Sequence, residues 1–449
     1  MNNQEKLIVN AHFDIPSITR EGGIRHLVVD LTSPKLVNSE ENEANSLNLG
    51  VVIDASGSMS ASVSEGRLRG RRGNRFDSCL EAAKAAAIGV VESLGKKDRL
   101  SIVSFSDDAQ VHISGQVMDD GGRREAIEEI TRMHTRGSTN LHDGWLKGAE
   151  EVALLMDENE GYQNRVVILS DGHANQGIVE PEALGEIAGG LRERGITSST
   201  VGIGVHYSTD QLEQIAIQGG GMLHHAQEPG EIVEVVLGEL GSMKNTFAEN
   251  LVFECSLPPG VGGRIIGLPF HSDRDGLRCP VGFLMSEQSR QVVVHLDIPG
   301  GLTQLFLDFD VKLRWKEVAD GGKQKTHSET VTLPVGEEAD LDVEIGQMVV
   351  DMWSSEVIQR AMVMNREGDY EGVDAYWRIQ IAAFKAYCVD LPDTEELLKK
   401  LERTWRSVRR PMPEYARKEV HTAQLKMMRS VPDAREDIQS SSWEKFLDK

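Results

Sequence analysis

A carboxylate and two hydroxyl groups follow a short apolar run near the start of the chain. Residues 51–53 (Val-Val-Ile) are β-branched, which is typical of a strand buried on both faces. Asp54, Ser56 and Ser58 come directly after this run, at alternate positions. Open α/β sheets bind their ligands at the carboxyl ends of parallel strands. Because all three side chains offer hard oxygen atoms, the pattern predicts a site for Mg²⁺ or Mn²⁺.

Two later segments carry side chains of the same kind. Thr139 lies in the segment 137–142, just before a predicted helix, and Asp171 lies at the end of a second apolar run at 166–172. Together with Asp54, they define three loops that can converge at one edge of a sheet. A simpler explanation is that such residues only cap helices and end strands, as a single Ser or Thr often does. The presence of all five residues favours the metal site.

The five residues, in this order, resemble the metal-ion-dependent adhesion site of von Willebrand factor A domains, whose pattern is D-x-S-x-S…T…D. The resemblance implies that Ser56 and Ser58 ligate the metal directly through their hydroxyl groups. Thr139 would bind directly or through water. Asp54 and Asp171 would act mainly through water and by orienting the serines.

The resemblance also implies a cofactor and a function. The metal would be Mg²⁺, or else Mn²⁺ or Ca²⁺. Few direct negative charges would leave it electron-poor, so that an Asp or Glu of a partner protein can fill its sixth position. This predicts a metal-dependent protein–protein interaction module that is not an enzyme. Within this family, cytoplasmic bacterial members imply a MoxR-type ATPase or an operon neighbour as partner.

Two other functions stay open on the sequence. A Mg²⁺-dependent hydrolase or phosphatase-like enzyme could use Asp54 and Asp171, although catalysis normally adds a general base or nucleophile. The only nearby candidate is His173. A purely structural assembly subunit would bind its partners without any metal. The order of the domains also weakly resembles inter-α-trypsin inhibitor heavy chains and bacterial calcium-activated chloride channel homologues.

An arginine-rich segment follows the first metal motif directly. Its five arginines are Arg67, Arg69, Arg71, Arg72 and Arg75. The simpler interpretation is a flexible, solvated loop. The alternative is an electropositive collar that draws an acidic partner segment to the metal, since arginine forks suit carboxylates and phosphates. The five residues are therefore candidate partner-binding residues.

Composition excludes several classes of function. The 449-residue chain has a formal net charge of −23, which argues against nucleic-acid binding and against docking on anionic lipid. No stretch approaches the roughly 18 apolar residues of a membrane span, and the amino-terminal segment lacks an apolar signal core. The four cysteines lie far apart, without a CxxC pair. These features predict a cytoplasmic protein with reduced thiols.

Strand and helix patterns alternate over residues 46–243, the region of the resemblance, and predict a doubly wound, mostly parallel α/β sheet. Short alternating apolar runs over 244–338 predict an antiparallel β-sandwich. Strand-like segments within 1–45 have no partners of their own, so we expect them to join this sandwich, with the α/β domain as an insertion. Helical spacing over 339–430 predicts a helical domain that begins with an antiparallel hairpin. Residues 431–449 form a polar tail.

Overall fold

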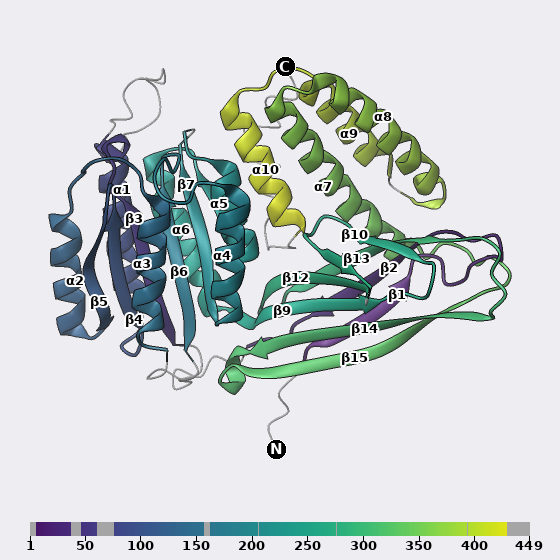
Figure 1. Ribbon diagram of the computed structural model, residues 1–449, viewed down its shortest axis with the longest axis horizontal. Helices are drawn as coiled ribbons and strands as arrows, with labels where there is room; N and C mark the ends of the chain where they lie inside the picture. The colour runs from purple at the N-terminus through teal and green to yellow at the C-terminus, as the bar shows by residue number, and fades with distance from the viewer. Residues whose placement is uncertain are drawn as a thin grey trace. The chain divides into compact units, whose positions relative to one another are not determined.

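The computed structural model describes residues 6–36, 46–60, 76–156, 162–204, 206–274, 276–392 and 394–428 (Figure 1). These residues divide into two compact units. One unit comprises the described parts of Leu36–Asn250 together with Trp315–Lys325. The other comprises the described parts of Met1–Lys35, Leu251–Arg314 and Thr326–Lys449.

The first unit is built on a six-stranded sheet in the order β5-β4-β3-β6-β7-β8. Only β5, at one edge, runs antiparallel to its neighbour. Every residue of β3 is buried, as the β-branched run predicted. The strands are β3 (Leu47–Asp54), β4 (Arg99–Phe105), β5 (Ala109–Val117), β6 (Gln163–Ser170), β7 (Ile196–Ile203) and β8 (Gly220–Ala226).

Helices cover both faces of this sheet (Figure 1). Three of them, α1, α2 and α6, share one apolar core with the sheet, while α3, α4 and α5 pack on the other face. Their bounds are α1 (Cys79–Ser93), α2 (Asp120–Arg132), α3 (Leu141–Ala153), α4 (Pro181–Glu193), α5 (Thr209–Gln218) and α6 (Pro229–Lys244). This arrangement is the doubly wound α/β fold that the alternating pattern predicted.

Helix α3 lies unusually close to the sheet. A Cβ atom built on Gly144 would lie 2.5 Å from the Cβ of Phe105, and one on Gly148 would lie 2.3 Å from Cγ2 of Val52. Both distances are shorter than van der Waals contact, so only glycine fits at these positions. The two glycines let the helix backbone approach β3 and β4, and three of the predicted metal residues lie at or just after the carboxyl end of β3.

The second unit contains strands of two antiparallel sheets. One sheet has the order β1-β2-β13-β10, and the other has the order β11-β12-β9-β14-β15. Strand β2 pairs along its whole length with β13, from Thr32 opposite Ser289 to Gly23 opposite Ile298. The strands are β1 (Ile8–Phe13), β2 (Gly23–Thr32), β9 (Thr246–Ser256), β10 (Gly262–Ile265), β11 (His271–Asp273), β12 (Gly276–Met285), β13 (Ser289–Ile298), β14 (Phe306–Glu317) and β15 (Lys323–Pro334). Since β2 precedes the α/β region in the chain and β13 follows it, the predicted insertion is confirmed.

Four helices are described after the last strand: α7 (Val343–Glu367), α8 (Tyr370–Tyr387), α9 (Thr394–Val408) and α10 (Glu414–Met428). The first two form the predicted hairpin, and Gly368 ends α7 in the left-handed conformation with φ 77°. The sequence pattern did not resolve α9 and α10 as separate helices. Short 3₁₀ segments are also described, namely η2 (Gly57–Ser60), η4 (Val318–Asp320) and η5 (Cys388–Asp390). None of the described helices is both long and apolar enough to cross a membrane.

Candidate metal centre

Asp54 ends β3 at the centre of the six-stranded sheet, between β4 and β6. Its side chain is completely buried. Oδ1 accepts a hydrogen bond from the backbone N–H of Ser56 at 2.8 Å, and Oδ2 accepts one from the hydroxyl of Ser170 at 2.6 Å. The carboxylate therefore fixes the turn after β3 and ties it to the end of β6.

The two serines lie on the turn that this carboxylate holds. Ser56 is buried and Ser58 is exposed, and their Oγ atoms lie 2.9 Å apart. The Oγ of Ser58 also donates a hydrogen bond to Oδ1 of Asp171 at 2.6 Å. A backbone hydrogen bond of 3.1 Å from Gly57 to the carbonyl of Gly137 joins this turn to the loop before α3. Side chains that follow β3 and β6 thus meet at the carboxyl edge of the sheet, in the middle of its strand order, at a place we call the metal corner.

Thr139 brings the third loop to the same corner. The position that a Cβ atom would take on Gly172 lies 3.4 Å from Oγ1 of Thr139 and 3.8 Å from Oγ of Ser58. The Thr139 backbone is held by Asn175, which donates to its carbonyl at 3.1 Å and accepts from its N–H at 3.3 Å. The structure therefore brings together all five residues that the sequence singled out, and their role as ligands remains a proposal.

The carboxylates of Asp54 and Asp171 both lie in surroundings that disfavour their negative charge. Burial raises the pKa of the Asp171 carboxyl to about 6, and the neighbouring charge of Asp54 adds to the shift, while the hydrogen bond from Ser58 opposes it. Burial also raises the pKa of Asp54, against the hydrogen bonds from Ser170 and Ser56. Among the described residues, no cationic side chain offsets the rise of either pKa. A divalent cation would supply the missing positive charge.

The donor set fits a hard divalent cation. Three hydroxyl groups and two carboxylates provide only oxygen atoms, which suit Mg²⁺, Mn²⁺ or Ca²⁺ better than a soft metal. Among the residues that the structure describes, no group of three or more His, Cys, Asp and Glu side chains is arranged so that it could hold a metal ion. The proposed site has only two carboxylates, because hydroxyl groups supply its other oxygen ligands. It therefore does not count as such a group. The five residues therefore fit the divalent cation that the sequence predicted.

A hydrogen-bonded rim surrounds the site, and sequence reasoning missed it. Oδ1 of Asp107 accepts hydrogen bonds from the N–H and the hydroxyl of Ser138, and Nε2 of Gln176 donates to the same hydroxyl at 2.6 Å. These side chains tie together the loops after β4 and β6 and the loop before α3. Ser170 was also missed, although its position next to Asp171 at the end of a strand was the available signal.

Two other groups of residues are distinct from the five predicted ligands. The five arginines from Arg67 to Arg75 lie outside the described residues, so the collar hypothesis stays a prediction. His224 is in β8, and its Nε2 lies 2.7 Å from Oε2 of Glu239 in α6. Oε1 of Glu239 accepts a hydrogen bond from the Ser199 hydroxyl. This histidine belongs to a mostly buried polar cluster away from the metal corner.

Comparison with known proteins agrees with this fold. Residues 48–236 match the family model of the von Willebrand factor type A domain. The uncharacterized protein sll0103 of Synechocystis is 24% identical over 341 residues, which cover 73% of this chain and 76% of that protein. The Escherichia coli protein YfbK is 28% identical over 222 residues, covering 49% of this chain and 35% of YfbK.

Inter-alpha-trypsin inhibitor heavy chain H3 of Homo sapiens is 26% identical over 190 residues, which cover 41% of this chain and 19% of that protein. The match therefore spans about a fifth of the heavy chain. It confirms the distant similarity to such heavy chains that the order of the domains suggested.

Two solved structures share most of the fold. A von Willebrand factor type A protein from Catenulispora acidiphila superposes with a TM-score of 0.64 at 18% identity, covering 90% of this chain and 91% of that one. The ArnB paralog VWA2 from Sulfolobus acidocaldarius gives a TM-score of 0.55 at 16% identity, covering 94% of this chain and 99% of that one. At these identities the likeness shows the fold alone, and it extends beyond the α/β region.

Proposed function

Because this chain carries a von Willebrand factor type A domain over residues 48–236, we propose that it is a non-enzymatic, metal-dependent interaction module. A divalent cation, Mg²⁺ or else Mn²⁺ or Ca²⁺, would be held by the five oxygen-bearing residues of the metal corner. It would bind an Asp or Glu side chain of a partner protein. Domains of this family typically mediate protein interactions through such sites.

The observation that carries the proposal is the different exposure of the donor groups. Asp54 and Asp171 are buried, whereas Ser58, which is hydrogen-bonded to Asp171, is exposed. A cation held among these groups would be anchored from the inner side and accessible from the outer side. A partner carboxylate could therefore reach it without any opening of the fold.

The chemistry of the donors favours binding over hydrolysis. When bound, the cation would supply a concentrated positive charge that attracts a carboxylate. The side chains that hydrogen-bond to Asp54 and Asp171 are serines, not a histidine or lysine that could act as a general base. Three hydroxyl donors neutralise little of the cation's charge. We therefore propose that the residual charge is used to hold a partner.

We also propose a cytoplasmic location, with a MoxR-type ATPase or an operon neighbour as a candidate partner. The four cysteines, Cys79, Cys255, Cys279 and Cys388, are free thiols, as expected for a reducing compartment. The excess of acidic over basic residues, 71 against 48, disfavours nucleic acid and anionic membranes as partners.

The first test is cation binding by matched hydroxyl variants. Ser58→Ala removes a proposed ligand, whereas Ser60→Ala removes an exposed hydroxyl two residues further on, whose hydrogen bond among the described residues is to the carbonyl of Gly57. Calorimetric titration with MgCl₂ should give saturable binding to the wild type and to Ser60→Ala, with an affinity loss of about tenfold or more for Ser58→Ala. Equal affinities for both variants would place the cation elsewhere.

The second test separates the three functions. Partner capture from the host should need Mg²⁺, and it should be lost with EDTA and with Asp54→Ala. Capture that survives both treatments would instead support a structural assembly subunit. Turnover of phosphate esters with Mg²⁺, abolished by Asp54→Ala, would support a hydrolase.

A further inference from the structure

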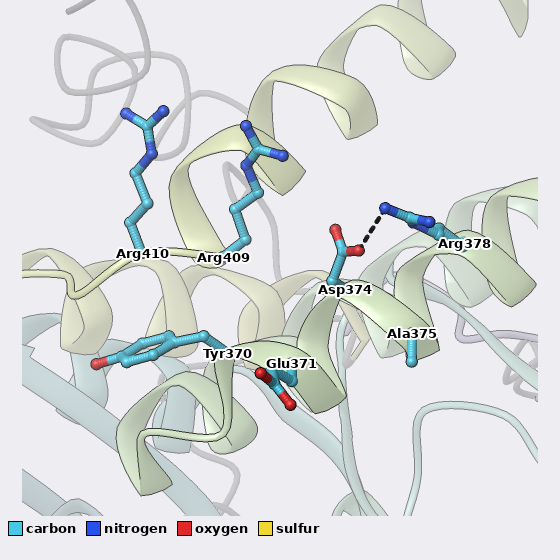
Figure 2. A pocket seen from close by; sticks show the side chains of 7 residues that line it. All are labelled: Tyr370, Glu371, Asp374, Ala375, Arg378, Arg409 and Arg410. Atoms are coloured by element: carbon cyan, nitrogen blue, oxygen red, sulfur yellow. Dashed lines mark ion pairs between the residues drawn. The ribbon is translucent and has the colours of Figure 1, made fainter.

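A second candidate site lies in the helical region of the other unit, where the end of α9 faces the start of α8. A cavity of about 630 Å³ is present there (Figure 2). Cavities of this volume accommodate small molecules. It is lined by Tyr370, Glu371, Asp374, Ala375, Arg378, Arg409 and Arg410.

Two guanidinium groups in this cavity have no acidic partner among the described residues. Arg409 packs over the ring of Trp405 at 4.8 Å, and Arg410 is exposed. In the described part of the chain, neither arginine forms an ion pair. Figure 2 shows both side chains extending in the same direction from the end of α9. Two like charges on consecutive residues, with no acidic partner in the described part of the chain, favour the binding of an anion.

The third arginine of the cavity differs from these two. Arg378 forms an ion pair of 2.7 Å with Asp374, whose other oxygen accepts a hydrogen bond from Nε1 of Trp405 at 3.1 Å. Asp374 is therefore already engaged by two neighbours and does not neutralise the free pair. Figure 2 shows the carboxylate of Glu371 turned away from the guanidinium groups of Arg409 and Arg410.

A buried residue fixes the backbone that presents the two free arginines. Asn365 of α7 is completely buried, and its Nδ2 donates hydrogen bonds to the carbonyl groups of Val408 at 2.5 Å and Arg410 at 2.7 Å. The chain is thereby anchored on both sides of Arg409. Such anchoring lowers the entropy that is lost when the two side chains bind a ligand.

We propose that this cavity binds a small phosphorylated molecule. A phosphoryl group would lie between Arg409 and Arg410, because the planar fork of a guanidinium group matches phosphate oxygens in a bidentate manner. The Tyr370 ring offers an apolar face for the organic part of the ligand. A chain with a net charge of −23 repels large polyanions, whereas a small anion can reach a local pair of positive charges.

The experiment is calorimetric titration of the full chain in EDTA, which removes any contribution of the metal corner. The probes are ADP and pyrophosphate, with adenosine as the uncharged counterpart of ADP. The test variant is Arg409→Gln with Arg410→Gln. The matched control is Arg406→Gln, which removes an exposed arginine in the last turn of α9 that does not line the cavity. Arg409→Lys with Arg410→Lys keeps the charge but loses the fork.

We expect saturable binding of ADP or pyrophosphate and none of adenosine. The double glutamine variant should lose affinity by about tenfold or more, and Arg406→Gln should change it by less than about twofold. The double lysine variant should be intermediate. Failure of the wild type to bind either phosphate compound would overturn the proposal, as would equal loss in the control. Binding of phosphopeptides or anionic vesicles, but not of the small phosphates, would also overturn it.

Discussion

The hydroxyl of Ser58 donates a 2.6 Å hydrogen bond to Asp171, a residue 113 positions further along the chain. This bond joins the turn after β3 to the end of β6, so the two parallel strands deliver their polar termini to one point. Ser58 is exposed and Asp171 is buried. The bond therefore links an exposed proposed ligand of the cation to a buried one.

Cation affinity should depend on pH through Asp171. The pKa of its carboxyl is raised to about 6 in the absence of a cation, so protons compete with the metal below that pH. We expect the dissociation constant for Mg²⁺ to rise about tenfold between pH 7 and pH 5. Titration calorimetry at both values measures this change, and an unchanged constant would contradict it.

The same shift predicts how the cation affects stability. A folded-state pKa above the ordinary value means that the cation-free protein loses stability as pH rises from about 4 to about 6. Bound Mg²⁺ reverses this loss, since it binds the ionised form. At 100 times its dissociation constant, Mg²⁺ should raise the free energy of unfolding by about 2.7 kcal/mol at pH 7. Urea denaturation with and without MgCl₂ tests this value.

Ser170 should be a positioning residue for the site. Its hydroxyl donates to Oδ2 of Asp54 at 2.6 Å in a completely buried environment. Ser170→Ala should weaken Mg²⁺ binding by about 10- to 100-fold, as is usual when a residue that orients a metal ligand is lost. Ser60→Ala serves again as the control. Retention of wild-type affinity by Ser170→Ala would show that Asp54 needs no such support.

Replacing glycine by alanine should change the free energy of unfolding in opposite directions in α3 and in α4. Gly144→Ala and Gly148→Ala each place a methyl group within 2.5 Å of the sheet, and we expect each to lower the free energy of unfolding by about 1–3 kcal/mol. A Cβ atom added to Gly189 of α4 would meet no described atom within 4 Å, so Gly189→Ala should stabilise by about 0.5–1 kcal/mol. Urea denaturation followed by circular dichroism distinguishes the two outcomes.

A pair of histidines, the buried His26 and the half-buried His295, should make the stability of the protein pH-dependent. Nδ1 of His295 lies 3.1 Å from Nε2 of His26, whose Nδ1 is 2.7 Å from Oδ2 of Asp14. Burial, together with the charges of His26 and Arg264, lowers the pKa of His295 from 6.5 to about 4. The unfolded chain therefore takes up a proton between pH 6.5 and pH 4 while the folded chain does not.

The stability contribution of this shift is present above pH 6.5 and is lost as pH falls toward 4. Between pH 7 and pH 5 the loss should be about 2 kcal/mol. His295→Gln should flatten this part of the pH profile whatever its effect at pH 7. His271→Gln, which replaces an exposed histidine of β11, should keep the wild-type profile. An unchanged slope in His295→Gln would contradict the assignment.

The sequence alone determined the elements and the donor types of the metal corner. A β-branched run that ends in Asp54, Ser56 and Ser58 describes a buried strand and its polar end, because burial on both faces demands continuous apolar residues. Gly368 is a local signal of the same kind, since α7 ends there in the left-handed conformation that glycine adopts readily. These are local properties, and local patterns are sufficient to reveal them.

Only the tertiary structure decided which distant side chains touch. The support of Asp54 by Ser170, the rim formed by Asp107 and its partners, and the free charges of Arg409 and Arg410 depend on contacts between separate elements. A sequence lists each acid and each base, but it does not say which charges are already paired. Burial and pairing set the energy of a charge, and both arise only when the chain has folded.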